Sequence, residues 1–158
     1  MNGPLTAWGV VLLVLFGAAH YLVPSYISEA YMWVAIAVIL LVLNALIGKK
    51  MKSSEGSKTT WMQLSAFGFI TTLIVAFGVV PVSVSWLMSL WLLLIGAAIY
   101  SEGHANNMQM HNYWGLVLVI ASLFVPGFTS WYFMAGALFL GLGGLIGGLV
   151  QPGMAQKK

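Results

Sequence analysis

The run SWYFMAGALFLGLGGLIGGLV, residues 130–150, contains no charged residue. A helix of about 20 apolar residues is long enough to cross the hydrocarbon core of a bilayer. The whole chain has the same character, because 61% of its 158 residues are hydrophobic and only 6% are charged. An average soluble domain has about a quarter of its residues charged. The composition therefore predicts an integral membrane protein whose partner is the lipid bilayer.

Five further uncharged stretches precede this run, and together they predict an all-α polytopic membrane protein. We expect six transmembrane helices, arranged as three sequential helical hairpins in a single integral membrane domain, residues 1–158. The fifth stretch reaches spanning length only if its helix begins near residue 108, and a re-entrant segment is the alternative. The expected spans are 5–23, 30–48, 61–80, 82–100, 108–125 and 130–150.

Lysine indicates the orientation. All six basic residues are lysines, and they lie in two groups, at 49–58 and at 157–158. With six crossings both groups fall on one side of the membrane, and positively charged loops stay in the cytoplasm. We therefore expect a multi-pass protein of the inner or plasma membrane with both termini cytoplasmic. Six lysines without arginine do not form a nucleic-acid-binding face, so no nucleic acid is expected as a partner.

Tryptophan recurs at a fixed interval. Trp33 and Trp86 are 53 residues apart, and the motifs PVSVSW (81–86) and PGFTSW (126–131) align a proline, a serine and a tryptophan. One interpretation is internal triplication of a hairpin. The other is the ordinary preference of tryptophan for membrane interfaces. Three more tryptophans follow the 53-residue interval at the starts of the first, third and fifth spans: Trp8, Trp61 and Trp114.

Small residues mark one face of the last span. They are spaced by four, three and four residues, which places them on one side of a helix. Another backbone can approach closely there, and such contact drives helix association in lipid. The face is expected to pack inside the chain's own bundle or, alternatively, against another membrane subunit or a second copy. These residues are Ala137, Gly141, Gly144 and Gly148.

The middle of every expected span lacks Asp, Glu, Lys and Arg. This pattern argues against proton pumps, ion-coupled carriers and voltage sensors, which need ionisable groups within the membrane. The neutral polar side chains in the spans either hydrogen-bond between helices or line a path for a small uncharged solute. The four candidates are Asn44, Gln63, Thr72 and Ser89.

The stretch HANNMQMHNYW, residues 104–114, gathers histidine and methionine. If it is helical, His104, Met108 and His111 lie on one face, and thioether plus imidazole ligation suits Cu(I). The simpler interpretation is a polar connector that ends at interfacial aromatic residues. No cofactor is expected, and copper is the alternative.

Enzyme motifs are missing from the sequence. There is no HExxH, no GxSxG and no GxxxxGK[ST], and the chain contains no cysteine. The sequence therefore predicts a protein that is not an enzyme.

Segments 67–103 and 115–148 resemble the short hairpin repeat of the HdeD-like acid-resistance membrane proteins. In that family a helix ends at a proline, a brief turn follows, and a glycine-bearing helix returns. The resemblance implies an inner-membrane protein with no known catalytic residues.

Two shorter pieces, QLSAFGF (63–69) and FTSWYFMAGAL (128–138), are similar to parts of the AmiS/UreI amide and urea channel family. That family is also built from three two-helix hairpins. Its last helix carries a glutamate, where this chain has Ala135 and Gly136. The departure puts urea-type conduction in doubt.

Taken together, these features predict a non-catalytic integral membrane protein. The expected role is that of a scaffold or accessory subunit of a membrane assembly, or of a membrane stress-protection protein. The alternatives are a channel for small uncharged solutes and a Cu(I)-binding membrane helper.

Overall fold

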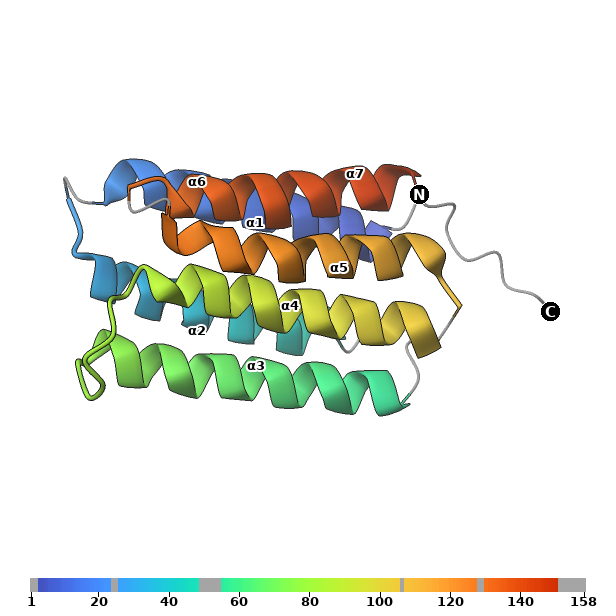
Figure 1. The fold of residues 1–158 in the computed structure, drawn as a ribbon, viewed down its shortest axis with the longest axis horizontal. Helices are drawn as coiled ribbons and strands as arrows, with labels where there is room; N and C mark the ends of the chain where they lie inside the picture. Colours follow the sequence, from blue (N-terminus) through green and yellow to red (C-terminus); the bar gives the residue numbers. More distant parts are fainter. Residues whose placement is uncertain (1–2, 24–25, 49–54, 106, 128–129, 151–158) are drawn as a thin grey trace.

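The computed structural model describes residues 3–23, 26–48, 55–105, 107–127 and 130–150. Over these residues the chain is all-helical, and they include no strand. The helices lie side by side, and each runs antiparallel to the one before it (Figure 1). The prediction of an all-α fold is confirmed.

The first five helices are regular, and the sixth changes its winding along its length. A short 3-10 turn, η1 (Val125–Gly127), follows the fifth helix. The sixth helix is continuous and consists of α6 (Tyr132–Gly136), the π-helical η2 (Ala137–Leu142) and α7 (Gly143–Val150), which we call together the C-terminal helix. The others are α1 (Gly3–Leu22), α2 (Glu29–Gly48), α3 (Glu55–Ala76), α4 (Trp86–Ala105) and α5 (Gln109–Phe124).

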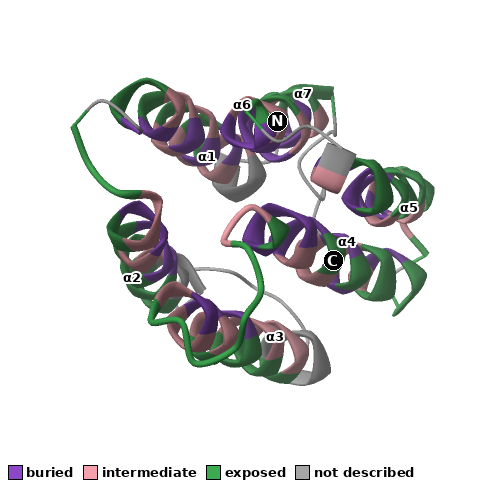
Figure 2. Cartoon of the chain, turned by 60° about the vertical axis from the view of Figure 1, so that its left-hand side comes forward, coloured by how far each residue is buried: buried purple, intermediate pink, exposed green. Residues whose placement is uncertain are grey.

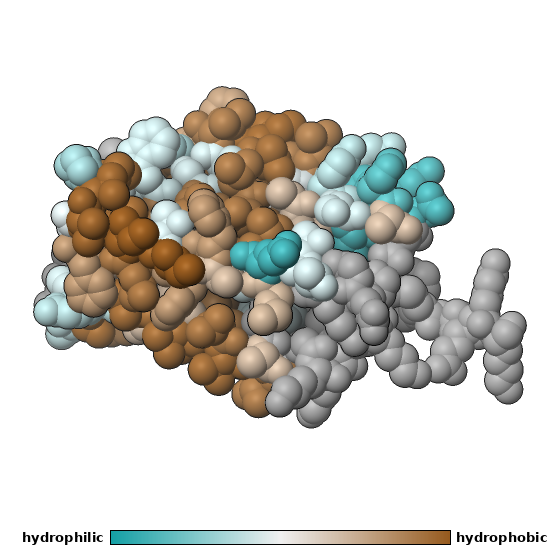
Figure 3. All heavy atoms as spheres, turned by 90° about the horizontal axis from the view of Figure 1, so that it is seen from below, coloured by the Kyte–Doolittle hydropathy of each residue, from teal (hydrophilic) through white to brown (hydrophobic). Residues whose placement is uncertain are grey.

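Three helical segments are long and apolar enough to cross a membrane: Thr59–Ala76, Trp86–Ala105 and Tyr132–Val150. Shorter apolar segments lie in α1 and α2, at Thr6–Leu22 and Glu29–Leu43. The apolar surface agrees with a lipid environment, since most of the face in Figure 3 is hydrophobic, with hydrophilic residues gathered at one end and a smaller hydrophilic group near the middle. The chain is therefore a membrane protein, and six crossings stay a prediction.

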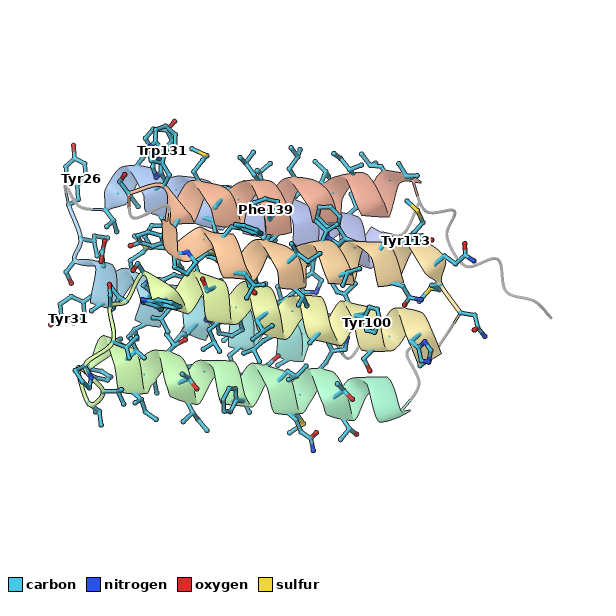
Figure 4. The ribbon with its side chains drawn as sticks, viewed as in Figure 1. Tyr26, Tyr31, Tyr100, Tyr113, Trp131 and Phe139 are labelled. Carbon is cyan, nitrogen blue, oxygen red and sulfur yellow. The ribbon has the colours of Figure 1, made fainter. Side chains whose placement is uncertain are left out.

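The bundle has two distinct ends. We call the end where α1 begins and α7 ends the terminal end, and the opposite end, where α1 ends and α2 begins, the loop end. Exposed aromatic side chains gather at both (Figure 4), with Tyr26, Tyr31 and Trp131 at the loop end and Tyr100 and Tyr113 at the terminal end. Such a distribution is typical of the two interfaces of a bilayer.

Close pairs in the bundle join helices from different hairpins. The most extensive contacts are between α4 and α5 and between α1 and the C-terminal helix. The contacts of α3 with α2 and α4 are smaller, and those of α1 with α2 are slight. Figure 2 shows buried residues on the sides of the helices that face one another, and α4 lies among the others.

The turn between α3 and α4 differs from the predicted boundaries. The predicted spans were 61–80 and 82–100, whereas α3 ends at Ala76 and α4 runs from Trp86 to Ala105. The residues between these helices are almost as apolar as the helices themselves. Hydropathy therefore could not locate the turn.

Glycine ends α3 at this turn. Gly78 has a φ of 68°, in the left-handed region that glycine adopts without a steric penalty. The Val79 N–H donates to the Ile74 carbonyl at 3.0 Å, and the Gly78 N–H donates to the Val75 carbonyl at 3.0 Å. This pair of hydrogen bonds is the Schellman motif, which satisfies carbonyls at a helix end.

Substitution Gly78→Ala should destabilise the protein by about 1–2 kcal/mol, the penalty for a side chain in the left-handed conformation. A Cβ at Gly78 would meet no atom within 4 Å, so any loss of stability comes from the backbone conformation and not from a steric clash. Unfolding in mixed detergent micelles, followed by far-UV circular dichroism, measures it. Gly17→Ala is the matched control, because position 17 is equally open but lies within a helix, where alanine is favoured. If the two variants were equally stable, the left-handed conformation of Gly78 would be contradicted.

Candidate functional site

Glycine brings α1 and the C-terminal helix into backbone contact. A Cβ added at Gly141 would overlap the backbone of Leu13, and one added at Gly9 would overlap the backbone of Leu145. Such close approach maximises dispersion between the two helices, which is a main source of their association in lipid.

The same kind of contact joins α4 to α5. A Cβ added at Gly115 would overlap the backbone of Tyr100, and one added at Gly96 would meet the backbone of Gly115 and of Val119. We call these two interfaces the α1 seam and the α5 seam.

The two seams have the same residue register. Gly9 and Gly115 are 106 residues apart, which is twice the tryptophan interval. Their partners, Leu145 and Tyr100, are 45 residues apart, the interval between PGFTSW and PVSVSW. The two seams are therefore copies of one packing arrangement.

A second contact has the same relation. A Cβ at Gly148 would overlap Thr6, and one at Gly103 would overlap Asn112. Gly148 and Gly103 again differ by 45 residues, and Thr6 and Asn112 by 106. Matching of both members in these two contacts favours internal triplication over a mere preference of tryptophan for interfaces.

The small residues singled out in the last span are all buried. Gly141 and Gly148 pack on α1, and the Gly9 contact extends to Gly144. Ala137 is buried in the core. The structure thus places this face inside the chain's own bundle rather than on its surface.

Aromatic side chains fill the loop-end half of the bundle. Trp33 is fully buried and stacks on Phe133 at a centroid distance of 5.3 Å, with Phe16 edge-on at 6.2 Å. Met88 is also fully buried and lies against Gly136. Trp33 lies near the start of α2, at the loop end, and its indole is buried in the core rather than exposed to lipid.

Thr72 hydrogen-bonds between helices. Trp91 Nε1 on α4 donates to Thr72 Oγ1 on α3 at 3.1 Å, and Thr72 Oγ1 donates to the Gly68 carbonyl at 2.7 Å. The buried hydroxyl therefore both accepts and donates, and the bond ties α3 to α4.

The other neutral polar candidates lie in different places. Gln63 is exposed on α3. Ser89 is buried seven residues before Gly96, so both lie on the α5 seam face of α4, and its hydroxyl has no hydrogen-bond partner among the described residues. The side chain of Asn44 lies outside the described part of the structure. Gln63, Thr72 and Ser89 thus do not converge on one path.

A polar cluster closes the terminal end between α3, α4 and α5. Trp61 Nε1 donates to Glu102 Oε2 at 3.1 Å. The buried His111 packs at Gly103, the residue next to Glu102 on α4. The cluster holds the start of α3 to the α4–α5 pair.

The three candidate copper ligands do not share a helical face. α4 ends before residue 106 and α5 begins after Met108, because Asn107 turns the chain with a φ of 53°. His104 is exposed on α4, whereas His111 is buried on α5. Among the described residues no three His, Asp or Glu side chains form a group suited to a metal ion. The premise of one continuous helix through this stretch is wrong, because the stretch contains the turn between α4 and α5.

Sequence reasoning missed the glycines on the partner helices. The signal was present, since Trp-Gly occurs at 8–9 and again at 114–115, two tryptophan intervals apart. The burial of Trp91 and its bond to Thr72 had no such signal, because helix rotation is set by packing.

No protein-family model, curated protein or solved structure matches this chain. The resemblances to the HdeD-like proteins and to the AmiS/UreI channels therefore stay predictions from the sequence.

Substitution Gly141→Leu should disrupt the α1 seam, since even a Cβ there overlaps the α1 backbone. Overpacking of a filled interior costs about 1–3 kcal/mol or more, and we expect the upper end or beyond because backbone cannot move aside as a side chain does. Detergent unfolding measures the loss. Gly17→Leu is the control, as its Cβ meets nothing within 4 Å. A Gly141→Leu protein as stable as the control would disprove the backbone contact.

Proposed function

We propose that this protein is a non-catalytic scaffold or accessory subunit of a membrane assembly, with membrane stress protection of the HdeD-like kind as the variant of that role. The observation that carries the proposal is the filled, apolar interior of the bundle. Function then resides on the outer faces of the helices, where lipid or another subunit makes contact.

The interior is lined mostly by apolar side chains. A selective path needs hydrogen-bond donors and acceptors along its wall. The largest fully buried side chains are instead almost all apolar, and they meet where the helices converge. They include Phe16, Trp33, Ile36, Met88 and Leu92.

The dispersal of the polar side chains supports the same proposal. Thr72 is engaged between two helices, Ser89 lies on the α5 seam face, and Gln63 points outward. None of the three is placed to pass a permeant to another. This arrangement favours a structural role over a channel for small uncharged solutes.

Six crossings with both termini in the cytoplasm complete the proposal. The support is the antiparallel array of Figure 1, in which the helices run side by side along one direction. The 16 residues of α5 span about 24 Å, and η1 lengthens the segment. Orientation depends on the lysines at 49, 50, 52, 157 and 158, which lie outside the described residues.

Gentle extraction from native membranes should yield this chain in complex with other membrane proteins. Native mass spectrometry of the tagged full chain in mild detergent measures this. Gly141→Leu provides a control, because partners that bind a folded outer surface should be lost when the bundle is disrupted. Recovery of a lone monomer under all mild conditions would refute the accessory-subunit role.

Proteoliposomes containing the pure protein should admit urea, acetamide and glycerol no faster than empty liposomes. The physical reason is the mostly apolar interior, which offers few hydrogen-bond partners to a solute that must shed its water. Stopped-flow light scattering gives the rate, with a known urea channel in parallel liposomes as the positive control. Entry that is faster than in empty liposomes and proportional to the amount of protein would replace the scaffold role by a channel.

A further inference from the structure

Three equivalent positions on α1 and α5 form the two glycine seams. Each position contacts the partner helix, which is the C-terminal helix for α1 and α4 for α5. At each contact one helix has a glycine, and a Cβ added there would meet the other helix. Equivalent positions are 106 residues apart, twice the repeat interval. The pairs are Thr6 and Asn112, Gly9 and Gly115, and Leu13 and Val119.

The same three positions on α3 are exposed. At the 53-residue interval they are Thr59, Met62 and Ala66, and Met62 is 75% exposed. Gln63 and Ile70 continue this exposed side, because the spacing of four, three and four residues from position 59 to position 70 follows the helical period. We call these five residues the α3 face. The third seam of the repeat, between α2 and α3, is therefore not closed at the equivalent positions.

α3 packs on its own bundle with the opposite side. Gly68, Thr72 and Val75 are buried and lie across the helix from the α3 face. The Trp91 ring of α4 lies against Gly68, and its Nε1 donates to Thr72 Oγ1. These contacts with α4 set the rotation of α3, and this rotation directs the α3 face away from the bundle.

The neighbouring helix α2 lacks the glycine that this face would need. Leu43 on α2 is equivalent to Gly96 on α4, which meets α5 in the closed seam. Close approach of two backbones in lipid requires small residues, and Leu43 does not provide one. Of the three long apolar segments, Thr59–Ala76 in α3 is accordingly the least buried.

A polar residue distinguishes the α3 face from the exposed sides of α1 and α5. Gln63 is exposed and lies one turn inside the apolar segment Thr59–Ala76. The exposed residues of α1 within 6–19, and those of α5 within 115–124, are all apolar. Figure 3 views the bundle from the side of α3 and shows a hydrophilic group near the middle of a mostly hydrophobic face. An amide in such a place is suited to hydrogen-bond with another helix.

We infer that two copies of this protein associate in the membrane through their α3 faces, about a two-fold axis that runs along the helices. Copies of a membrane protein share one orientation, so this axis brings the same residue of each copy to the same depth. Gln63 then lies opposite the same residue of the second copy.

The chemistry of the face fits a second copy. An amide both donates and accepts hydrogen bonds, so two Gln63 side chains are complementary to each other. Ala66 is small and lies one turn away, which allows the two helices to approach closely. The five residues of the face carry no charge, so the copies do not repel each other there. This self-association goes beyond the proposed scaffold role and does not depend on it.

Disulfide cross-linking tests the contact in membranes of cells that produce the full-length chain. The chain has no cysteine, so each variant has a single thiol. Ile70→Cys places the thiol in the α3 face, and Leu123→Cys places it at the equivalent exposed position of α5. Oxidation should convert most of the Ile70→Cys protein into a dimer of twice the chain mass and leave Leu123→Cys monomeric.

Three results of the cross-linking would overturn the inference. Equal dimer yields at the two positions would indicate random collision. An Ile70→Cys product that contains a different protein would mean that another subunit covers the face. Monomers at both positions would mean that lipid covers it.

Two substitutions test the face in the purified protein. Gln63→Leu removes the amide, and Ala66→Leu fills the space between the helices; both positions are exposed, so the bundle should remain folded, which far-UV circular dichroism checks. Energy transfer between donor-labelled and acceptor-labelled copies of the Leu123→Cys protein, diluted in detergent micelles, gives the dissociation constant. Gln63→Leu should raise this constant about 3- to 30-fold, which corresponds to one hydrogen bond between membrane helices. Ala66→Leu should raise it as well.

Ala97→Leu is the matched control, because it makes the same change at an exposed alanine of α4. It should leave the dissociation constant unchanged. If the constant is unchanged in both α3-face variants, or rises equally in the Ala97→Leu control, the inference fails. The measurement needs only this chain, so its failure is distinguishable from a failure of the proposed function, which is tested by the recovery of other membrane proteins.

Discussion

Contact between helix backbones at glycine is the interaction on which the rest of this bundle depends. Lipid chains are as apolar as leucine, so burying apolar side chains between helices gains little in a membrane. What remains is dispersion at short range, and it falls steeply when a gap opens between surfaces. Gly9 and Gly115 remove that gap, and each sets the position of one helix against another from a different hairpin.

This constraint also shapes the interior. Because the tight pairs form across hairpins, α1 and α2 of the first hairpin are left apart, and large side chains occupy the space between them. Trp33 and Phe16 fill it in the loop-end half with ring contacts that aromatic residues favour. The interior is consequently mostly apolar, and the hydrogen bond from Trp91 to Thr72 joins two neighbouring helices within it.

Two of the three repeated seams are closed, and the third is not. The difference follows from side-chain size at equivalent positions, since Met62 takes the place of Gly9 and Gly115. The contact between α2 and α3 is correspondingly smaller than the two contacts closed by glycine, between α4 and α5 and between α1 and the C-terminal helix.

The sequence by itself determined that the chain is helical and apolar enough for a membrane, because the length of uncharged runs reflects the thickness of the bilayer. It also indicated the glycine face of the last helix, since the spacing of Gly141, Gly144 and Gly148 follows the helical period. It misplaced the α3–α4 turn, where the loop is apolar, and its copper alternative required residues 104–111 to form one helix, although Asn107 turns the chain there. Only the tertiary structure decided which helices pair, which way each one is rotated, and that Trp33 is buried. Helix pairing and helix rotation depend on which helix backbones can come into contact. Hydropathy describes each segment separately, so it does not specify contacts between residues that are distant in the chain.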